Sequence, residues 1–206
     1  MGTGGKRERL LDLAEAAVLT KGYGATSIEE LVAEAGITKG GFFYHFRDKN
    51  DLACALLERA IAREAERLHA YFAAAHERHD DPLERLSAVL ERIAESASEG
   101  GLDRRGSLVG TFCNTPGVLD DRGRELLARA LTSSREPFAE ALREIAERYP
   151  IRDEIGIDAV ADRVFGTLEG GVVMAKALGE PDILAEQLRL LRSYLALLFG
   201  GAVVTG

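Results

Sequence analysis

Apolar residues recur every three or four positions along almost the whole chain, which is the spacing that places them on one face of a helix. The first such stripe ends at Gly22, and glycine can adopt the left-handed conformation that closes a helix. Ser27 followed by Glu30 has the spacing of a reciprocal capping box, so a second, short helix is expected to start at Ser27. Thr38 is also a good helix cap and predicts a third helix over 38–45.

Longer amphipathic segments fill the rest of the chain. Pro137 falls inside one of them, and a kink or a break is expected there because proline removes an amide donor and clashes with the preceding turn. Residues 1–5 contain three glycines and nothing to bury, which predicts a loose arm. The pattern shows no alternating strand and no repeat, so the fold class is all-α, with about nine helices. The later helices are predicted over about 48–76, 82–97, 108–113, 120–148, 158–178 and 181–199.

Composition and charge narrow the classes of protein. Two cysteines in 206 residues exclude a disulfide scaffold and a four-ligand zinc finger. No uncharged apolar run is long enough to span a membrane and no signal peptide leads the chain, so we expect a cytoplasmic protein with no membrane partner. The net charge of −8 disfavours nucleic acid, but residues 1–50 hold seven Lys/Arg and seven Asp/Glu, so the remainder carries the whole excess. Such a distribution is compatible with a DNA-binding N-terminal region.

The junction between the second and third predicted helices has the chemistry of a helix-turn-helix. Gly36 can take the positive φ of a tight turn, Ile37 can fill the angle between the helices, and Thr38 starts the next helix. The same pattern also fits an ordinary helical hairpin. The turn alone therefore leaves both interpretations open.

Residues 9–57 as a whole resemble the N-terminal DNA-binding domain of TetR-type transcriptional regulators. The resemblance implies an N-terminal three-helix helix-turn-helix domain over 1–50 and a C-terminal helical bundle for ligand binding and dimerisation over 51–206, in a two-fold dimer. Beyond the first domain the similarity is one of helix number and length only. The matching elements are Gly22-Tyr23, Ala25-Thr26-Ser27, Ala35-Gly36-Ile37-Thr38-Lys39-Gly40, the aromatic cluster 42–46, and Asp48-Lys49 ahead of Leu52.

The resemblance also implies that the helix after Thr38 enters the major groove of DNA. Two consecutive glycines are a poor choice for helix stability, but they would let the backbone approach the DNA closely. Phe43 stands where the family usually has tyrosine, and its ring cannot donate to a phosphate, so its role stays open. Phe42 and Phe46 are expected in the core. The expected DNA contacts are Thr26, Ser27, Thr38, Lys39, Gly40, Gly41, Tyr44, His45 and Lys49.

The last two helices predict a dimer interface. Leucines in the ninth helix follow heptad spacing, and glycines in the eighth permit close helix packing. Pairing both helices with their copies would give a four-helix bundle; the alternative is that both are buried in a monomer. A second apolar row, Leu190, Tyr194 and Leu197, lies on a neighbouring face of the ninth helix. The predicted interface residues are Gly170, Gly171, Leu184, Leu188, Leu191, Tyr194, Leu195 and Leu198.

Helices four to eight also carry apolar and aromatic residues that could line a pocket for a small molecule. The competing interpretation is that these residues form ordinary core. Glu169 lies in an apolar run and is the best candidate for a polar group inside such a pocket. The predicted pocket residues are Leu68, Phe72, Val109, Phe112, Cys113, Phe138 and Glu169.

Catalysis finds little support in the sequence. The four histidines show no metal-ligand spacing, and no phosphate-binding loop or nucleophile motif occurs, so we expect no enzyme, no cofactor and no metal. The sequence therefore predicts a ligand-responsive transcriptional regulator, most simply a repressor. It would bind a palindromic double-stranded DNA operator as a homodimer and be released by a small apolar or aromatic effector. The alternatives are a helical carrier or small enzyme that shares the N-terminal hairpin, and an architectural DNA-binding protein without an effector.

Overall fold

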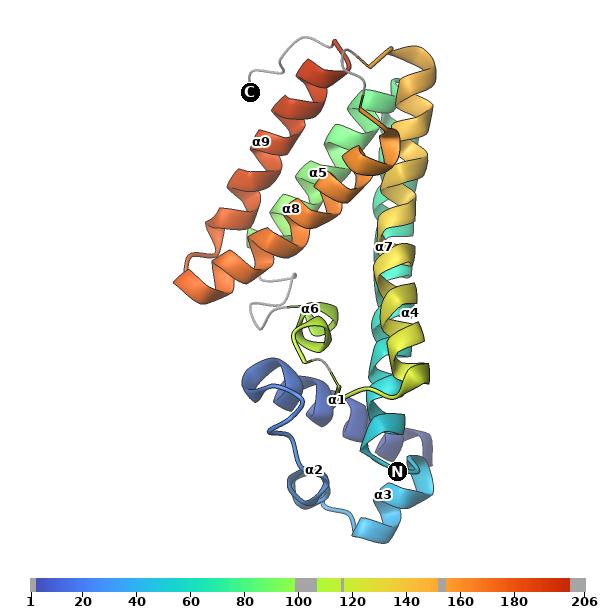
Figure 1. Ribbon diagram of the computed structural model, residues 1–206, viewed down its shortest axis with the longest axis vertical. Helices are drawn as coiled ribbons and strands as arrows, with labels where there is room; N and C mark the ends of the chain where they lie inside the picture. The colour runs from blue at the N-terminus through green and yellow to red at the C-terminus, as the bar shows by residue number, and fades with distance from the viewer. Residues whose placement is uncertain (1–2, 99–106, 116, 152–154, 201–206) are drawn as a thin grey trace. The chain divides into compact units, whose positions relative to one another are not determined.

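The computed structural model describes residues 3–98, 107–115, 117–151 and 155–200, and in these segments the chain is helical with no strand (Figure 1). The element types and most boundaries agree with the sequence prediction. The helices are α1 (Thr3–Lys21), α2 (Ile28–Ala35), α3 (Lys39–His45), α4 (Lys49–Arg78), α5 (Pro82–Ser98), α6 (Leu108–Cys113), α7 (Asp121–Arg148), α8 (Ile157–Leu178) and α9 (Asp182–Leu198).

One prediction about local structure was wrong, and another was wrong in part. The arm expected over residues 1–5 is part of α1 from Thr3 onward, and residues 1–2 lie outside the described part. Pro137 does not break its helix, since α7 continues through it to Arg148, while the kink expected as the alternative stays a prediction. Proline costs one backbone hydrogen bond, but Phe138, Ala139 and Leu142 after it are buried, and this burial favours continued helix.

The chain divides into two compact units, while the predicted division into a DNA-binding domain over 1–50 and a ligand-binding and dimerisation domain over 51–206 stays a prediction. The first unit contains α1–α3, α4 as far as Arg63, α6, and α7 as far as Leu131; the second contains the remaining parts of α4 and α7 with α5, α8 and α9. The first unit extends beyond the helix-turn-helix because α6 packs on α1, with the ring centroids of Tyr23 and Phe112 5.2 Å apart. The start of α4 is buried in the same cluster through Leu52.

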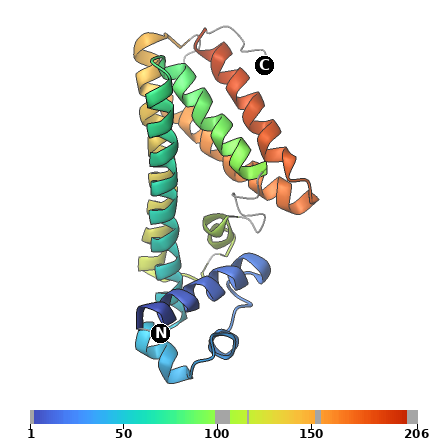
Figure 2. The same ribbon diagram turned by 180° about the vertical axis from the view of Figure 1, so that it is seen from behind.

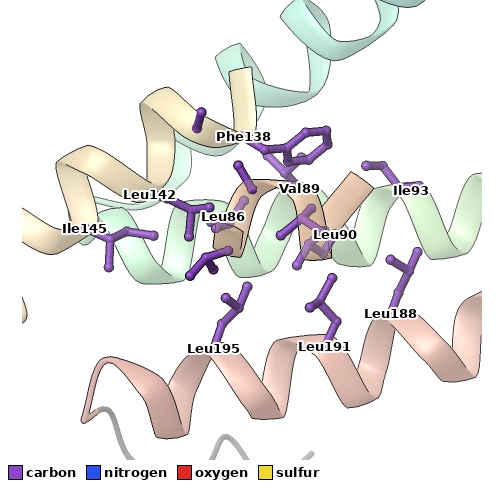
Figure 3. Packing of buried hydrophobic residues seen from close by; sticks show 14 of the residues in the cluster. Leu86, Val89, Leu90, Ile93, Phe138, Leu142, Ile145, Leu188, Leu191 and Leu195 are labelled. Carbon is purple, nitrogen blue, oxygen red and sulfur yellow. The ribbon is translucent and has the colours of Figure 1, made fainter. Parts of the chain in front are cut away.

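The core of the second unit lies between α5, α7, α8 and α9 (Figure 3). Helices α8 and α9 lie side by side, and α9 also packs along α5, as both ribbon views show (Figure 2). Leu86, Leu142 and Leu188 have no exposed surface, and each buried leucine contributes about 1.5–3 kcal/mol of hydrophobic stabilisation. This unit therefore has a core of its own, independent of the first.

Candidate nucleic-acid interface

Local capping chemistry builds the helix-turn-helix as the sequence predicts. The Ser27 hydroxyl accepts from the amide of Glu30, and the Glu30 carboxylate accepts from the amide of Ser27, both at 3.2 Å. Gly36 takes the left-handed conformation, with φ of 67°, and ends α2. Thr38 then accepts from the amide of Gly41 at 3.1 Å and starts α3. The turn geometry is thus fixed by side chains that are close in sequence.

The aromatic cluster of α3 is divided between the core and the surface. Phe42 and Phe46 are buried, as predicted, with ring centroids 5.5 Å apart, and they hold α3 on the core of the first unit. Phe43 and Tyr44 are exposed, with 47 % and 75 % of their surface accessible. Large exposed aromatic residues on a short, firmly anchored helix indicate a contact surface. Phe43, whose role the sequence leaves open, is therefore accessible from solvent and not part of the core.

Among the described residues, no close contact requires the two glycines of α3. A Cβ on Gly40 would lie 3.8 Å from Thr38 Oγ1, and one on Gly41 would lie 3.6 Å from Ile37 Cβ, which are ordinary van der Waals distances. Neither glycine has a positive φ. Since neither space nor backbone conformation requires glycine here, the missing side chains favour close approach by something outside the chain.

An open hollow of about 520 Å³ lies beside α3. Lys6 belongs to its lining but is absent from the contacts predicted from the sequence. The signal that could have identified it is the basic cluster of Lys6, Arg7 and Arg9. The hollow is lined by Lys6, Gly36, Ile37, Thr38, Gly41, Tyr44 and His45.

Two of the predicted DNA contacts also have partners within the chain. Thr26 is buried, which removes it from the contact surface, and its hydroxyl donates to the carbonyl of Gly22 at 3.0 Å. The ammonium of Lys49 donates to the carbonyl of Tyr23 at 2.7 Å and lies 4.3 Å from the centre of the Tyr23 ring. Burial lowers the pKa of Lys49. Both side chains satisfy carbonyl groups in the turn after α1, and a contact from half-buried Lys49 to DNA stays a prediction.

Lysines of α1 and α3 form ion pairs with glutamates of α2. Lys39, the first residue of α3, forms an ion pair with Glu29 of α2 at 2.7 Å, and Lys21 pairs with Glu30 at 2.6 Å. The hydrogen bond from Lys39 lowers the pKa of Glu29, and the one from Lys21 lowers the pKa of Glu30. Thr38 and Lys39 are exposed, and Ser27 and His45 are half-buried, so these predicted contacts remain accessible.

The structure corrects most of the predicted dimer interface. Leu184, Leu188, Leu191, Leu195 and Leu198 are all buried in the chain's own core, where Figure 3 shows three of them facing α5. Packing inside the chain also accounts for glycine at position 171, since a Cβ there would come within 2.6 Å of Leu184 Cδ1. Gly170 is open, because a Cβ added there would meet no atom within 4 Å, and Tyr194 is exposed.

Six large apolar residues are exposed on α8 and α9 instead. They include the second apolar row of α9, which the sequence places on a neighbouring face. Helical periodicity shows two apolar rows on α9, but it does not show which one the rest of the chain covers. We call this the α8–α9 apolar face: Val173, Met174, Leu178, Leu190, Tyr194 and Leu197.

The predicted pocket residues belong to two different units. Leu68, Phe72 and Phe138 pack in the second unit, where the rings of Phe72 and Phe138 meet edge to face at 5.7 Å. Phe112 is buried in the first unit, with Leu108 and Tyr23 in the same cluster. Val109 and Glu169 are half-buried and Cys113 is exposed. These residues thus contribute to two cores, and a pocket that they share remains a prediction.

The described residues give no sign of a metal centre or a membrane segment. They contain no group of three or more His, Cys, Asp or Glu side chains arranged to hold a metal ion. None of the helices, over the positions described, combines the length and the apolar character that crossing a bilayer requires.

The sequence is similar to those of known regulatory proteins. The family model for bacterial regulatory proteins of the tetR family matches residues 10–56. The transcriptional regulator AcuR of Cereibacter sphaeroides is 30 % identical over 162 residues, which is 79 % of this chain and 72 % of that protein. The repressor DhaR of a Mycobacterium species is 24 % identical over 82 % of each chain.

Solved structures are similar over nearly the full chain. The crystal structure of a regulatory protein TetR from Rhodobacter sphaeroides superposes with a TM-score of 0.75 and 27 % identity, covering 90 % of this chain and 96 % of that one. A TetR transcriptional regulator from Chloroflexus aurantiacus gives a TM-score of 0.76 and 26 % identity, covering 94 % and 96 %. The similarity therefore extends well beyond the helix-turn-helix.

Proposed function

The chain belongs to the TetR family of bacterial transcriptional regulators, and from this premise we propose that it is a homodimeric repressor whose α3 binds in the major groove of a palindromic operator. The main support for the proposal comes from the exposed surface of α3. This helix is anchored by buried phenylalanines, presents Tyr44 to solvent, and contains two glycines that nothing inside the chain requires.

The proposed contacts are those whose side chains or backbone remain accessible. Lys39 and Tyr44 would reach phosphates or base edges of the DNA from α3. Ser27 would reach the sugar–phosphate backbone of the DNA from the start of α2. Gly40 and Gly41 would let the helix lie deep in the groove. His45 and Lys6, which line the hollow beside α3, can donate to phosphate oxygens.

Dimerisation through the α8–α9 apolar face supports operator binding. Large exposed apolar side chains on neighbouring helices mark an interaction surface, and Gly170 leaves room for a second helix to approach. A second copy is the occupant we propose, because a two-fold dimer presents two copies of α3. Their half-sites would lie about 34–36 Å apart along the DNA, or a multiple of this spacing.

We also propose that a small apolar or aromatic effector releases the repressor. The effector would bind near the Phe72–Phe138 contact, where an aromatic pair joins α4 to α7 within the second unit. Helix α4 is continuous from Lys49 to Arg78 and takes part in both units. Effector and operator would then oppose each other through a coupling free energy of typically about 1–3 kcal/mol. Such a protein would act in the cytoplasm, where the DNA lies.

Fluorescence anisotropy tests the proposal with labelled duplexes tiled across the DNA upstream of the protein's own gene. We expect one palindromic segment to bind saturably, with affinity that falls steeply as salt rises. In a dimer, Lys39→Ala removes one proposed contact from each subunit and should lower the affinity for this segment. Arg129→Ala is the matched control, since Arg129 is exposed and lies outside the proposed interface.

If none of the duplexes binds saturably, the proposal is contradicted, and a carrier or an enzyme is favoured. Equal binding to all duplexes would instead favour an architectural DNA-binding protein. Effector candidates are then titrated into the protein–operator complex. A ligand that binds the dimer without changing operator affinity would refute the proposed release mechanism while leaving DNA binding intact.

A further inference from the structure

We propose that Glu29 is a positioning residue that sets DNA specificity: its carboxylate holds the Lys39 ammonium at the contact surface and withholds it from the phosphates of arbitrary DNA. The proposal rests on the DNA-binding function proposed above. It concerns one ion pair that joins the two helices of the helix-turn-helix.

The geometry places this pair at the surface that would meet DNA. Lys39 is the first residue of α3 and Glu29 is the second of α2, and Lys39 Nζ lies 2.7 Å from Glu29 Oε1. The Lys39 side chain is 59 % exposed and the Glu29 side chain 67 % exposed. Both charges can therefore be reached by DNA, and neither is committed to the protein core.

Glu29 lies in the first turn of α2, where its carboxylate accepts from its own amide, but it is not the residue that forms the capping box. The capping box of α2 uses Glu30, whose carboxylate accepts from the amide of Ser27 and also binds Lys21. Helix α3 itself contains no acidic residue. Glu29 is thus a negative charge that is paired with the basic residue of the recognition helix, on a surface that would otherwise attract phosphates.

The chemistry of the pair separates specific from non-specific binding. A lysine ammonium has three donors, so Lys39 can keep one on Glu29 and direct another to an acceptor on a base edge. Non-specific binding relies on phosphates alone, and these carry a full negative charge that the Glu29 carboxylate beside Lys39 repels, whereas a base-edge acceptor is neutral. Glu29 should therefore weaken non-specific binding more than operator binding.

The test measures Glu29→Gln against two DNA probes: the palindromic duplex selected above and a random-sequence duplex of the same length. Since an exposed ion pair is worth little, we expect affinity for the random duplex to rise only about two- to five-fold per subunit. Its salt slope should steepen by about 0.9 per subunit as Lys39 gains a phosphate. Operator affinity should stay the same or fall, so the ratio of the two affinities decreases.

Glu30→Gln is the matched control, because it removes the same charge from the neighbouring residue, whose partner Lys21 lies outside α3. A double-mutant cycle with Lys39→Met should abolish the effect of Glu29→Gln on the affinity ratio. The inference is overturned if Glu29→Gln and Glu30→Gln change both affinities equally, or if the effect persists without Lys39. If the wild-type protein binds neither duplex, the proposed function itself fails, and the inference fails with it.

Discussion

Replacing Gly40 and Gly41 with alanine should make the protein more stable and a weaker DNA binder. Stability and DNA affinity are expected to change in opposite directions. The two glycines lie in a helix, where glycine is unfavourable, but they belong to a surface that must approach DNA closely. The structure separates these effects, since each added methyl group meets only ordinary contacts inside the chain.

The magnitude of the stability change follows from the space around each glycine. A Cβ on Gly40 would lie 3.8 Å from Thr38 Oγ1, and one on Gly41 would contact Ile37 and Thr38 at 3.6 Å. No strain opposes the substitutions, so each should raise the free energy of unfolding by about 0.5–1 kcal/mol. On the operator, the methyl groups would hold α3 away from the base edges. Losing one good base contact costs about 1–3 kcal/mol, so affinity should fall by at least about five-fold.

Urea unfolding and fluorescence anisotropy on the same samples measure the two effects. The random-sequence duplex is the internal control: it is held through phosphates, and its affinity should change less than that of the operator. Stabilised variants that bind the operator as tightly as the wild type would refute the close approach of α3. Variants that lose stability would refute the inference that the fold does not need these glycines.

Three further changes test other parts of the structure. Lys49→Met should lower the free energy of unfolding by about 1–2 kcal/mol in urea, because it removes the charged hydrogen bond to the Tyr23 carbonyl, which then keeps only the one from the Thr26 amide. The salt slope of operator binding should not change, and a shallower slope would identify Lys49 as a phosphate contact. Leu190→Lys should yield monomers in analytical ultracentrifugation, and a variant that remains dimeric would exclude the α8–α9 apolar face as the interface. Burial alone would raise the pKa of Asp81, but hydrogen bonds from Tyr149 and from backbone amides outweigh it and lower the pKa below the usual 3.8. The stabilisation by Asp81 is therefore complete above pH of about 4 and is lost as the pH falls through the lowered folded-state pKa. Asp81→Ala should lower the free energy of unfolding by about 1–2 kcal/mol at pH 7 and by progressively less in acid. A loss of stability that is equal at pH 7 and pH 2 would contradict this assignment.

Local chemistry explains why the helix boundaries could be predicted from the sequence. Ser27 with Glu30, and Thr38 with Gly41, satisfy the free amides at the start of a helix through residues that are three apart. Gly36 ends α2 because it can adopt a left-handed conformation. None of these interactions depends on how distant parts of the chain pack.

Tertiary packing decided the features that the sequence could not predict. Helix α9 carries two apolar rows, and only contact with α5 and α8 determines that Leu188 is buried and Leu190 is exposed. The polar side chains of Thr26 and Lys49 are equally suited to phosphates and to turn carbonyls, and the turn after α1 uses both. The aromatic residues proposed for a pocket, such as Phe138, are also good core residues, so periodicity alone does not distinguish the two roles.

The arrangement of charge in the first unit explains how an acidic protein can present a surface for DNA. Glu8, Asp12 and Glu15 of α1 are all held by Arg59 of α4, whose side chain is only 11 % exposed. Arg63 also pairs with Asp12 and Glu15, so two arginines offset most of the charge of these three carboxylates, while α3 carries Lys39 and no acid of its own. Because the potential at a binding surface depends mainly on charges within about a Debye length of 8–10 Å, pairing of this kind matters more than the net charge of the chain. A neutral count over the first 50 residues thus conceals a separation of charge, in which the acids of α1 pair with arginines of α4 and α3 itself contains a basic residue and no acidic one.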